Sequence, residues 1–201
     1  MILDWFRHGS NGVLVAFIAV MTVLFAIGKV EFNWLAAAIG AVIFLSSEYT
    51  THRFLLHAKP QSAPWLLNLQ HRLHYDHHID PPKLELLFLP LWFIIPTAAL
   101  YFCVYLAITR NLTLSLSLTF GSIVALTFYE WVHYVAHVPF TPVTPFGKYM
   151  KKYHLWHHFK NEHYWFGVTS TVADHLLGTA PDQATIARSR TARTLGTDGL
   201  G

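Results

Sequence analysis

Residues 34–57 read WLAAAIGAVIFLSSEYTTHRFLLH, an apolar segment that continues into a polar end with two histidines. The segment is strongly apolar as far as Leu45, and no Gly or Pro follows before His57 that would end a helix. A helix over these 24 residues would be about 36 Å long at ~1.5 Å per residue, whereas the hydrocarbon core of a bilayer is ~30 Å thick. The segment therefore predicts a membrane span whose C-terminal end, with His52 and His57, projects out of the lipid.

Composition and three further segments agree with a membrane protein. Of the 201 residues, 53% are apolar and only 12% are charged, which differs from the balance of a soluble globular domain. Further spans are expected at about 12–28, 84–108 and 112–137. The first of these has a secretory signal as its alternative, which Asp4 and the lack of a small-residue cleavage site disfavour. We expect an all-α integral membrane bundle of four transmembrane helices, with the second span at 34–57.

Prolines shape the last two spans. Pro90 and Pro96 are expected to kink the third span, because neighbouring groups in a membrane bundle can take over the freed carbonyls. The fourth helix continues through His133 and His137 until Pro139 ends it. Both even-numbered spans therefore deliver histidines at their C-terminal ends.

The distribution of Lys and Arg predicts the orientation. Short connections join the first span to the second and the third to the fourth, so each pair is an antiparallel hairpin. Only Lys29 and Arg110 of the 14 Lys and Arg lie opposite the histidine-bearing ends, and the other twelve lie on the histidine side. Because cytoplasmic loops are enriched in Lys and Arg, we expect both termini and the histidines on the cytoplasmic face.

We expect residues 1–180 to form one membrane-embedded domain, with a cytoplasmic helical cap at about 58–83 and 138–180. The tail, 181–201, is rich in Thr, Arg, Gly and Asp without an apolar period, and is expected to be disordered. The basic residues adjoin apolar runs, so no nucleic-acid partner is expected. Cys103 is the sole cysteine, which excludes an intrachain disulfide and a thiolate zinc cluster.

Histidine is the most unusual component of the chain, with 14 residues. Ten of them fall into four sets with repeated spacing: His52 and His57; His74, His77 and His78; His133 and His137; and His154, His157 and His158. The same 17-residue step leads from each helix-end pair to the His-x-x-His-His motif that follows, and four histidines recur 80 positions later. The sequence therefore contains two copies of one unit: a hairpin, a helix-end pair and a His-x-x-His-His motif.

These histidines predict two metal ions. At ~100° per residue, the three rings of a His-x-x-His-His motif lie within one 100° arc and can turn toward a common centre. His133 and His137 share a helix face, whereas His52 and His57, about 140° apart, require a distorted helix end or two different ions. Ten imidazoles exceed the needs of one ion, so we expect two ions with about five ligands each. Imidazole suits Zn, Cu, Fe and Ni, and a site at the mouth of a lipid-embedded bundle favours iron for oxygen chemistry.

Ligating imidazoles need their second nitrogen fixed, commonly by a carboxylate or a carbonyl. Five side chains lie near enough in sequence to support them: Glu48, Asp76, Tyr129, Glu130 and Asp174. Glu48 and Glu130 are favoured, because an ionised Glu near hydrocarbon is costly without a partner. The other four histidines are not counted as ligands: His8 is expected to cap a helix or reach the interface, and the rest are expected to be supporting or interfacial, namely His71, His163 and His175.

Four motifs resemble those of the membrane fatty acid hydroxylase and sterol desaturase superfamily, most closely the catalytic domain of fatty acid 2-hydroxylase: EYTTHRFLLHAKP at 48–60, HYDHH at 74–78, YEWVHYVAH at 129–137 and HLWHHFKNEHYWFGVTSTVADHLLGT at 154–179. The resemblance implies a monooxygenase in which two iron ions use O₂ to hydroxylate a fatty acyl or other lipid substrate. It implies the ten histidines as iron ligands, with Tyr129 and Glu130 supporting them and no catalytic residue besides the ligands. Zinc is able to replace iron during expression. Eukaryotic relatives often carry a fused cytochrome b5 domain; for this chain we expect a separate electron donor of the cytochrome b5 or ferredoxin type.

Two alternatives stay open. The same metal centre serves a desaturase or a sterol or carotenoid oxidase, because these reactions also begin with hydrogen abstraction. A non-enzymatic membrane protein that binds metal or haem is less favoured. Transport sites lie near the bilayer midplane, and haem needs only one or two axial ligands.

Overall fold

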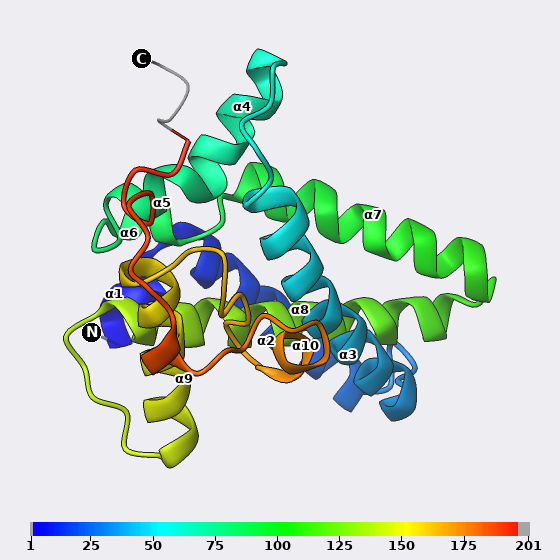
Figure 1. Ribbon diagram of the computed structural model, residues 1–201. Helices are drawn as coiled ribbons and strands as arrows, with labels where there is room; N and C mark the ends of the chain where they lie inside the picture. Colours follow the sequence, from blue (N-terminus) through cyan, green and yellow to red (C-terminus); the bar gives the residue numbers. More distant parts are fainter. Residues whose placement is uncertain (1, 197–201) are drawn as a thin grey trace. The chain divides into compact units, whose positions relative to one another are not determined.

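A computed structural model describes residues 2–196, and every regular element in that range is a helix (Figure 1). The chain divides into two compact units. The first, here called the apolar unit, comprises Met1–Leu45 and Leu89–Trp131, and the second, the histidine unit, comprises Ser46–Phe88 and Val132–Gly201. Helices α3 (Trp34–Thr51) and α8 (Leu112–His137) begin in the apolar unit and end in the histidine unit.

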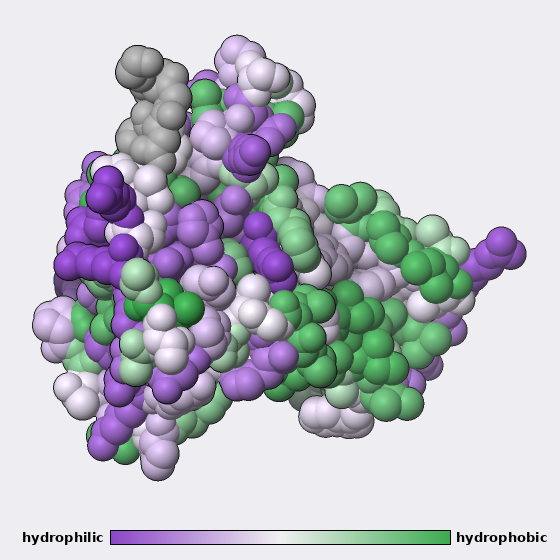
Figure 2. Space-filling view, viewed as in Figure 1, coloured by the Kyte–Doolittle hydropathy of each residue, from purple (hydrophilic) through white to green (hydrophobic). Residues whose placement is uncertain are grey.

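The apolar unit also contains α1 (Ile2–Arg7), α2 (Gly9–Ala26) and α7 (Leu91–Thr109). Its interior holds two apolar clusters, one that includes Leu14 and Ile94 and another that includes Tyr105 and Leu118. Many other large apolar side chains of these helices are exposed, and Figure 2 shows hydrophobic residues gathered over the unit. Such extensive apolar surface is typical of helices that contact lipid.

Helices α3 and α8 approach each other closely within the apolar unit. A Cβ atom on Gly40 would lie 1.9 Å from the carbonyl oxygen of Leu118, and one on Gly121 would lie 1.8 Å from that of Ala37. The Ser122 hydroxyl donates a hydrogen bond to the carbonyl of Gly40 at 2.9 Å. Glycine at both positions allows the two backbones to meet, which is a common way for membrane helices to pack.

Four helical segments are long and apolar enough to cross a membrane: Gly9–Ala26, Trp34–Leu56, Leu84–Thr109 and Leu112–His137. They coincide closely with the four predicted spans and confirm the all-α fold. The third segment is interrupted, because α6 (Leu84–Leu87) ends before Pro90 and α7 begins after it. Pro90 thus separates two helices instead of kinking one, since a residue that precedes proline disfavours the helical conformation. Pro96 lies inside α7, and the kink expected there stays a prediction.

The histidine unit is built from short helices around the ends of the long ones. Helix α3 passes directly into a π-helix, η1 (His52–Leu56). The elements that follow are α4 (Pro64–Gln70), the π-helix η2 (His71–Tyr75), α5 (Asp76–Ile79) and α6, and, after α8, α9 (Pro145–Phe159), α10 (Val172–Leu176) and the 3-10 helix η3 (Gln183–Thr185). Met150, Tyr153 and Trp165 form an apolar core in this unit.

The C-terminal tail makes specific contacts over the residues that the structure describes, 181–196, while its disorder stays a prediction. Ala192 is only 3% exposed. The Ser189 N–H donates to the carbonyl of Lys160 at 2.7 Å, and the Thr191 hydroxyl donates to the carboxylate of Glu162. These partners lie far away in sequence, so the composition of the tail could not reveal them. The rest of the predicted disordered segment, 197–201, lies outside the described residues.

Candidate metal centre

The histidine unit brings ten of the 14 histidines together in two groups of five. Group one comprises His52, His57, His74, His78 and His157, and group two comprises His77, His133, His137, His154 and His158. Within each group, one nitrogen from every ring lies within 4.8 Å of the others. These are the same ten histidines that the repeated motifs single out.

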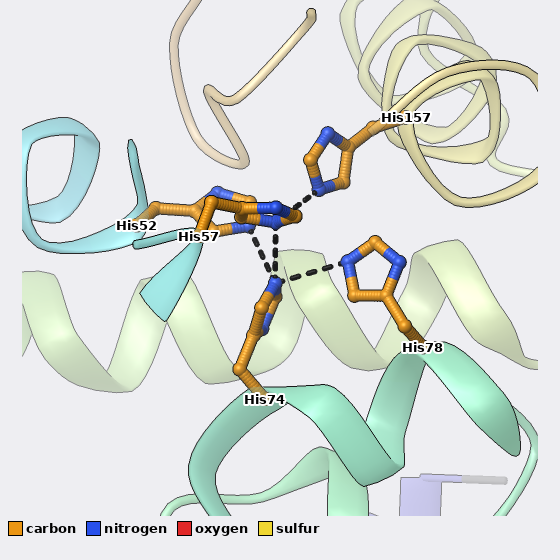
Figure 3. Close-up of side chains that lie close together, drawn as sticks. All are labelled: His52, His57, His74, His78 and His157. Carbon is orange, nitrogen blue, oxygen red and sulfur yellow. Dashed lines mark hydrogen bonds between the residues drawn. The ribbon is translucent and has the colours of Figure 1, made fainter. Parts of the chain in front are cut away.

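Group one converges on its Nε2 atoms (Figure 3). The Nε2 atom of His74 lies 3.1 Å from that of His52, 2.7 Å from that of His57 and 3.0 Å from that of His78. The Nε2 atoms of His157 and His57 are 3.0 Å apart. The rings come from η1, η2, α5, α9 and the residue that follows η1, so the group forms only when these segments meet.

Group two has the same character. The Nε2 atoms of His77 and His133 are 3.1 Å apart, and those of His154 and His137 are 2.9 Å apart. The fifth ring, His158, lies with its centroid 4.6 Å from those of His77 and His137. Helix α8 supplies two of the rings, α9 supplies two and α5 supplies one.

These spacings fit a metal ion at the centre of each group. Two ligand nitrogens at right angles, each about 2.1 Å from an ion, lie about 3.0 Å apart, and opposed ones lie about 4.2 Å apart. The Nε2 separations of 2.7–3.1 Å agree with the first value, and no two ligand nitrogens of a group are more than 4.8 Å apart. Five nitrogens per group exceed the four of a tetrahedral zinc site and suit an ion with a higher coordination number.

The first helix-end pair reaches a single group through the π-helix. His52 and His57 are five residues apart, and the π-helix η1 closes with a hydrogen bond from the His57 N–H to the His52 carbonyl at 3.0 Å. This wider turn stacks residue i+5 over residue i. The expected distortion of the helix end is confirmed, and both rings of the pair join group one. His133 and His137 are four apart and need no such turn, since α8 stays α-helical to its end.

Each His-x-x-His-His motif divides between the two groups. His74 and His78 join group one while His77 joins group two; in the second copy the outer rings join group two and His157 joins group one. The prediction that all three rings of one motif face a common centre is therefore wrong. Three rings within an arc of 100° can bind one ion, but they can also reach two neighbouring ions. The first repeat thus supplies one ring, His77, to group two, and the second repeat supplies one ring, His157, to group one.

Burial keeps the rings neutral. It lowers the pKa well below the ordinary value, and the neighbouring imidazoles lower it further, in five histidines outside the spans: His74, His77, His154, His157 and His158. Burial also lowers the pKa of His78 to about 3, although a hydrogen bond to the carbonyl of Ala192 acts in the opposite direction. Neutral imidazoles offer the lone pairs that a metal ion requires.

Three rings of group one are held by backbone carbonyls. His52 Nδ1 lies 2.5 Å from the carbonyl of Phe166, and His157 Nδ1 lies 2.8 Å from that of Tyr164. His78 Nδ1 lies 3.1 Å from the carbonyl of Ala192. A carbonyl only accepts, so each ring donates from Nδ1 and keeps the lone pair on Nε2 for a metal. Sequence reasoning missed these carbonyls, because every residue has one and only the path of the chain selects these three.

Glu48 and Asp174 are buried and act through the same loop. Glu48 accepts from the N–H groups of Val168 and Thr169 at 2.7 and 3.1 Å, and from the Thr169 hydroxyl. Asp174 accepts from the N–H groups of Phe166 and Gly167 at 2.9 and 2.7 Å. Both carboxylates therefore bind the loop that carries the Phe166 carbonyl. They support His52 through that loop, whereas the sequence had suggested direct bonds to imidazoles.

The other predicted supporting residues have separate surroundings. Glu130 is fully buried in the apolar unit, where its Oε1 accepts from the Leu89 N–H at 3.1 Å. Tyr129 packs against the apolar cluster of that unit, with its ring 6.4 Å from that of Phe44. Their support of the metal ligands stays a prediction. Asp76 accepts from His71, which is not in either group, at 2.9 Å.

The three remaining histidines also lie outside both groups. His8 lies 2.8 Å from the Ser10 hydroxyl. His163 is 3.5 Å from a carboxylate oxygen of Glu162 and is largely exposed. His175 bonds the carbonyl of Thr171 within its own helical turn.

Comparison with known proteins identifies the family of the chain. The family model for fatty acid hydroxylases matches residues 37–179, a range that contains all ten histidines of the two groups. The chain belongs to the fatty acid hydroxylase family. This membership and the four apolar helices make it a multi-pass membrane protein with a dimetal histidine site.

Relatives in the hydroxylase family include plant and fungal proteins. The chain is 33% identical over 148 residues to dihydroceramide fatty acyl 2-hydroxylase FAH2 of Arabidopsis thaliana, which covers 73% of this chain and 61% of that protein. It is 31% identical over 148 residues to ceramide very long chain fatty acid hydroxylase SCS7 of Saccharomyces cerevisiae, which covers 70% of this chain and 36% of that one. The chain thus spans less than two thirds of the length of these relatives.

A solved structure of full-length scs7p, in which only the hydroxylase domain is visible, has the same fold. It matches with a TM-score of 0.74 and 25% sequence identity over 92% of this chain and 69% of that chain.

Proposed function

We propose that this protein is an O₂-dependent membrane hydroxylase that adds one oxygen atom to the fatty acyl chain of a lipid, with two iron ions as cofactor. The observation that carries the proposal is the pair of buried five-histidine groups within a chain of the fatty acid hydroxylase family. The overall reaction consumes a C–H bond, O₂, two electrons and two protons, and yields an alcohol and water.

Iron is favoured over zinc by the donor set and by the reaction. Five imidazoles per ion exceed a tetrahedral shell, and zinc has no redox chemistry with which to activate O₂. When bound, the iron pair would supply the redox chemistry that couples reduction of O₂ to oxidation of the C–H bond. Zinc is expected to occupy the site when iron is scarce during expression.

The residues of the chain hold and shield the centre. Neutral rings in a buried cluster exclude water and leave the positive charge to the ions. The carbonyls of Phe166, Tyr164 and Ala192 fix three rings of group one so that Nε2 faces the ion. No other side chain is needed as acid or base in this proposal.

The names of the relatives support a substrate class. FAH2 is named for dihydroceramide fatty acyl groups and SCS7 for very long chain fatty acids of ceramide. We propose a sphingolipid-like or other fatty acyl substrate, hydroxylated at the carbon next to the carbonyl. Electrons would come from a donor of the cytochrome b5 or ferredoxin type, on the cytoplasmic face where the Lys and Arg distribution predicts the histidines.

Lipid mass spectrometry after expression in a host that lacks 2-hydroxylated lipids tests the proposal. Cells with the wild-type chain are expected to accumulate acyl chains that have gained one oxygen. His157→Ala should abolish this product, whereas His163→Ala should retain it, because His163 is exposed and outside both groups. Acyl chains that lose two hydrogens and gain no oxygen would instead identify a desaturase.

A further inference from the structure

The described end of the chain makes a set of specific contacts beyond the residues that the family model matches. Residues 186–196, here called the C-terminal strap, follow the matched range of 37–179. Ser189 and Thr191 donate hydroxyl hydrogen bonds to Oε1 of Glu162, whose side chain is fully buried. The strap ends in the described chain at Gly196, where φ is 82° and a Cβ would lie 2.2 Å from the ring of Tyr75. A buried carboxylate thus receives its hydrogen bonds from the strap, which fixes the path of this segment.

Arg193 joins the strap to the end of α5, which carries His78. Its Nε donates to the carbonyl of His78 at 3.0 Å, and its Nη2 donates to the carbonyl of Ile79 at 2.7 Å. The guanidinium also lies 5.2 Å from the ring centroid of Phe159. A planar fork that bridges the last two carbonyls of a helix is a contact that Arg can make and Lys cannot reproduce.

Ala192 connects the strap to group one. The residue is only 3% exposed, and its carbonyl accepts the Nδ1–H of His78 at 3.1 Å. The strap therefore holds His78 twice, at its ring through Ala192 and at its backbone through Arg193. This is the arrangement that fixes the tautomer and the direction of a metal-binding imidazole.

Three rings of group two lack such anchors among the described residues. The Nδ1 atoms of His77, His154 and His158 are buried and have no hydrogen-bond partner there. Three rings of group one, by contrast, donate to carbonyls between Tyr164 and Ala192. The two groups therefore offer equal numbers of nitrogens but unequal support.

We propose that the C-terminal strap makes the two metal sites unequal: it locks His78 so that group one retains its ion, while group two exchanges its ion more readily. Arg193 is a positioning residue in this scheme. The proposal rests on the paired metal site of the proposed function but not on the reaction that the site performs.

Release of metal to a chelator tests the strap. Full-length protein from iron-replete cells, in detergent, is mixed with excess 1,10-phenanthroline, and the iron that remains on the chain is measured over time. Two phases of one ion each are expected from the wild type. His133→Ala, which removes a ligand of group two, should abolish the fast phase and so assign it.

Arg193→Ala should accelerate the slow phase roughly tenfold, the lower end of the effect seen when the outer partner of a metal ligand is lost. The fast phase should not change. Arg190→Ala is the matched control, since Arg190 is an exposed arginine of the same strap. Arg193→Lys should restore the slow phase only in part. If Arg193→Ala does not fold, Thr191→Val provides a second test. It loosens the strap from Glu162 without touching α5, and it should also accelerate the slow phase.

The outcomes separate the two proposals. Equal slow phases in Arg193→Ala and Arg190→Ala overturn the role of the strap, and so does an equal acceleration of both phases, which would indicate general loss of structure. Protein that releases iron as expected but forms no hydroxylated lipid overturns the proposed reaction and leaves the strap standing. A wild type that binds no metal overturns both.

Discussion

Glu48 illustrates how a single buried residue supports the centre without touching it. Its carboxylate collects two backbone N–H groups and one hydroxyl from Val168 and Thr169. Two residues before, the Phe166 carbonyl holds His52. The side chain at position 48 must therefore accept hydrogen bonds, because all three of its partners donate.

Glu48→Ala should therefore lower the thermal unfolding temperature in detergent and reduce the iron content. Unpartnered buried N–H groups cost about 1–3 kcal/mol. Glu48→Gln should retain most of the stability, because its amide oxygen accepts the two N–H groups while its NH₂ donates to the Thr169 hydroxyl. A glutamine variant as unstable as the alanine variant would show that the negative charge is what matters. Glu85→Gln, an exposed change, serves as control.

The ten clustered histidines were predictable from sequence, while their support was not. A repeat at fixed spacing is improbable unless the rings act together, so the motifs identify them. The partners of the rings are main-chain carbonyls of Tyr164, Phe166 and Ala192, which no side-chain pattern marks. Asp174 was near enough in sequence to be noticed, but its bonds to the loop appear only in the folded chain.

Among the helices, the crossing of α3 and α8 depends on two glycines. Gly121→Ala would place a methyl group 1.8 Å from the carbonyl oxygen of Ala37, so the helices must separate. Overpacking of this kind typically costs about 1–3 kcal/mol. We expect a clear fall in the thermal unfolding temperature in detergent. Gly9→Ala, with nothing within 4 Å of the new Cβ, should behave as the wild type, and equal behaviour of the two variants would refute the close crossing.

Hydrophobicity predicted the positions of the long helices well. Local departures from regular helix geometry were harder to predict. The boundaries of α8 agree with the predicted 112–137, because a long apolar run between breakers leaves few choices. The five-residue spacing of His52 and His57 predicted a distorted helix end, and the π-helix is that distortion. The division of each His-x-x-His-His motif could not be predicted, because helical angles give the directions of the rings but not the positions of the ions.

For the molecule as a whole, the Lys and Arg distribution predicts which face carries the centre. In a Cys103→Ser background, Asn111→Cys places a thiol in the connection after α7, and Ser62→Cys places one between η1 and α4. A membrane-impermeant maleimide should label the first in intact cells and the second only after lysis, because Asn111 belongs to the side with few basic residues. Labelling in the reverse order would place the histidines on the outer face.

The exchange of His77 and His157 between the groups also bears on how such a protein could arise. A shorter polypeptide with a single repeat would supply four histidine rings to one ion. Its fifth ring would face a second ion. It could complete its shell only by association with a second copy of itself, each subunit donating one ligand to its neighbour. Gene duplication and fusion would turn that obligate dimer into one continuous chain. Loss of either half would then remove ligands from both metal sites.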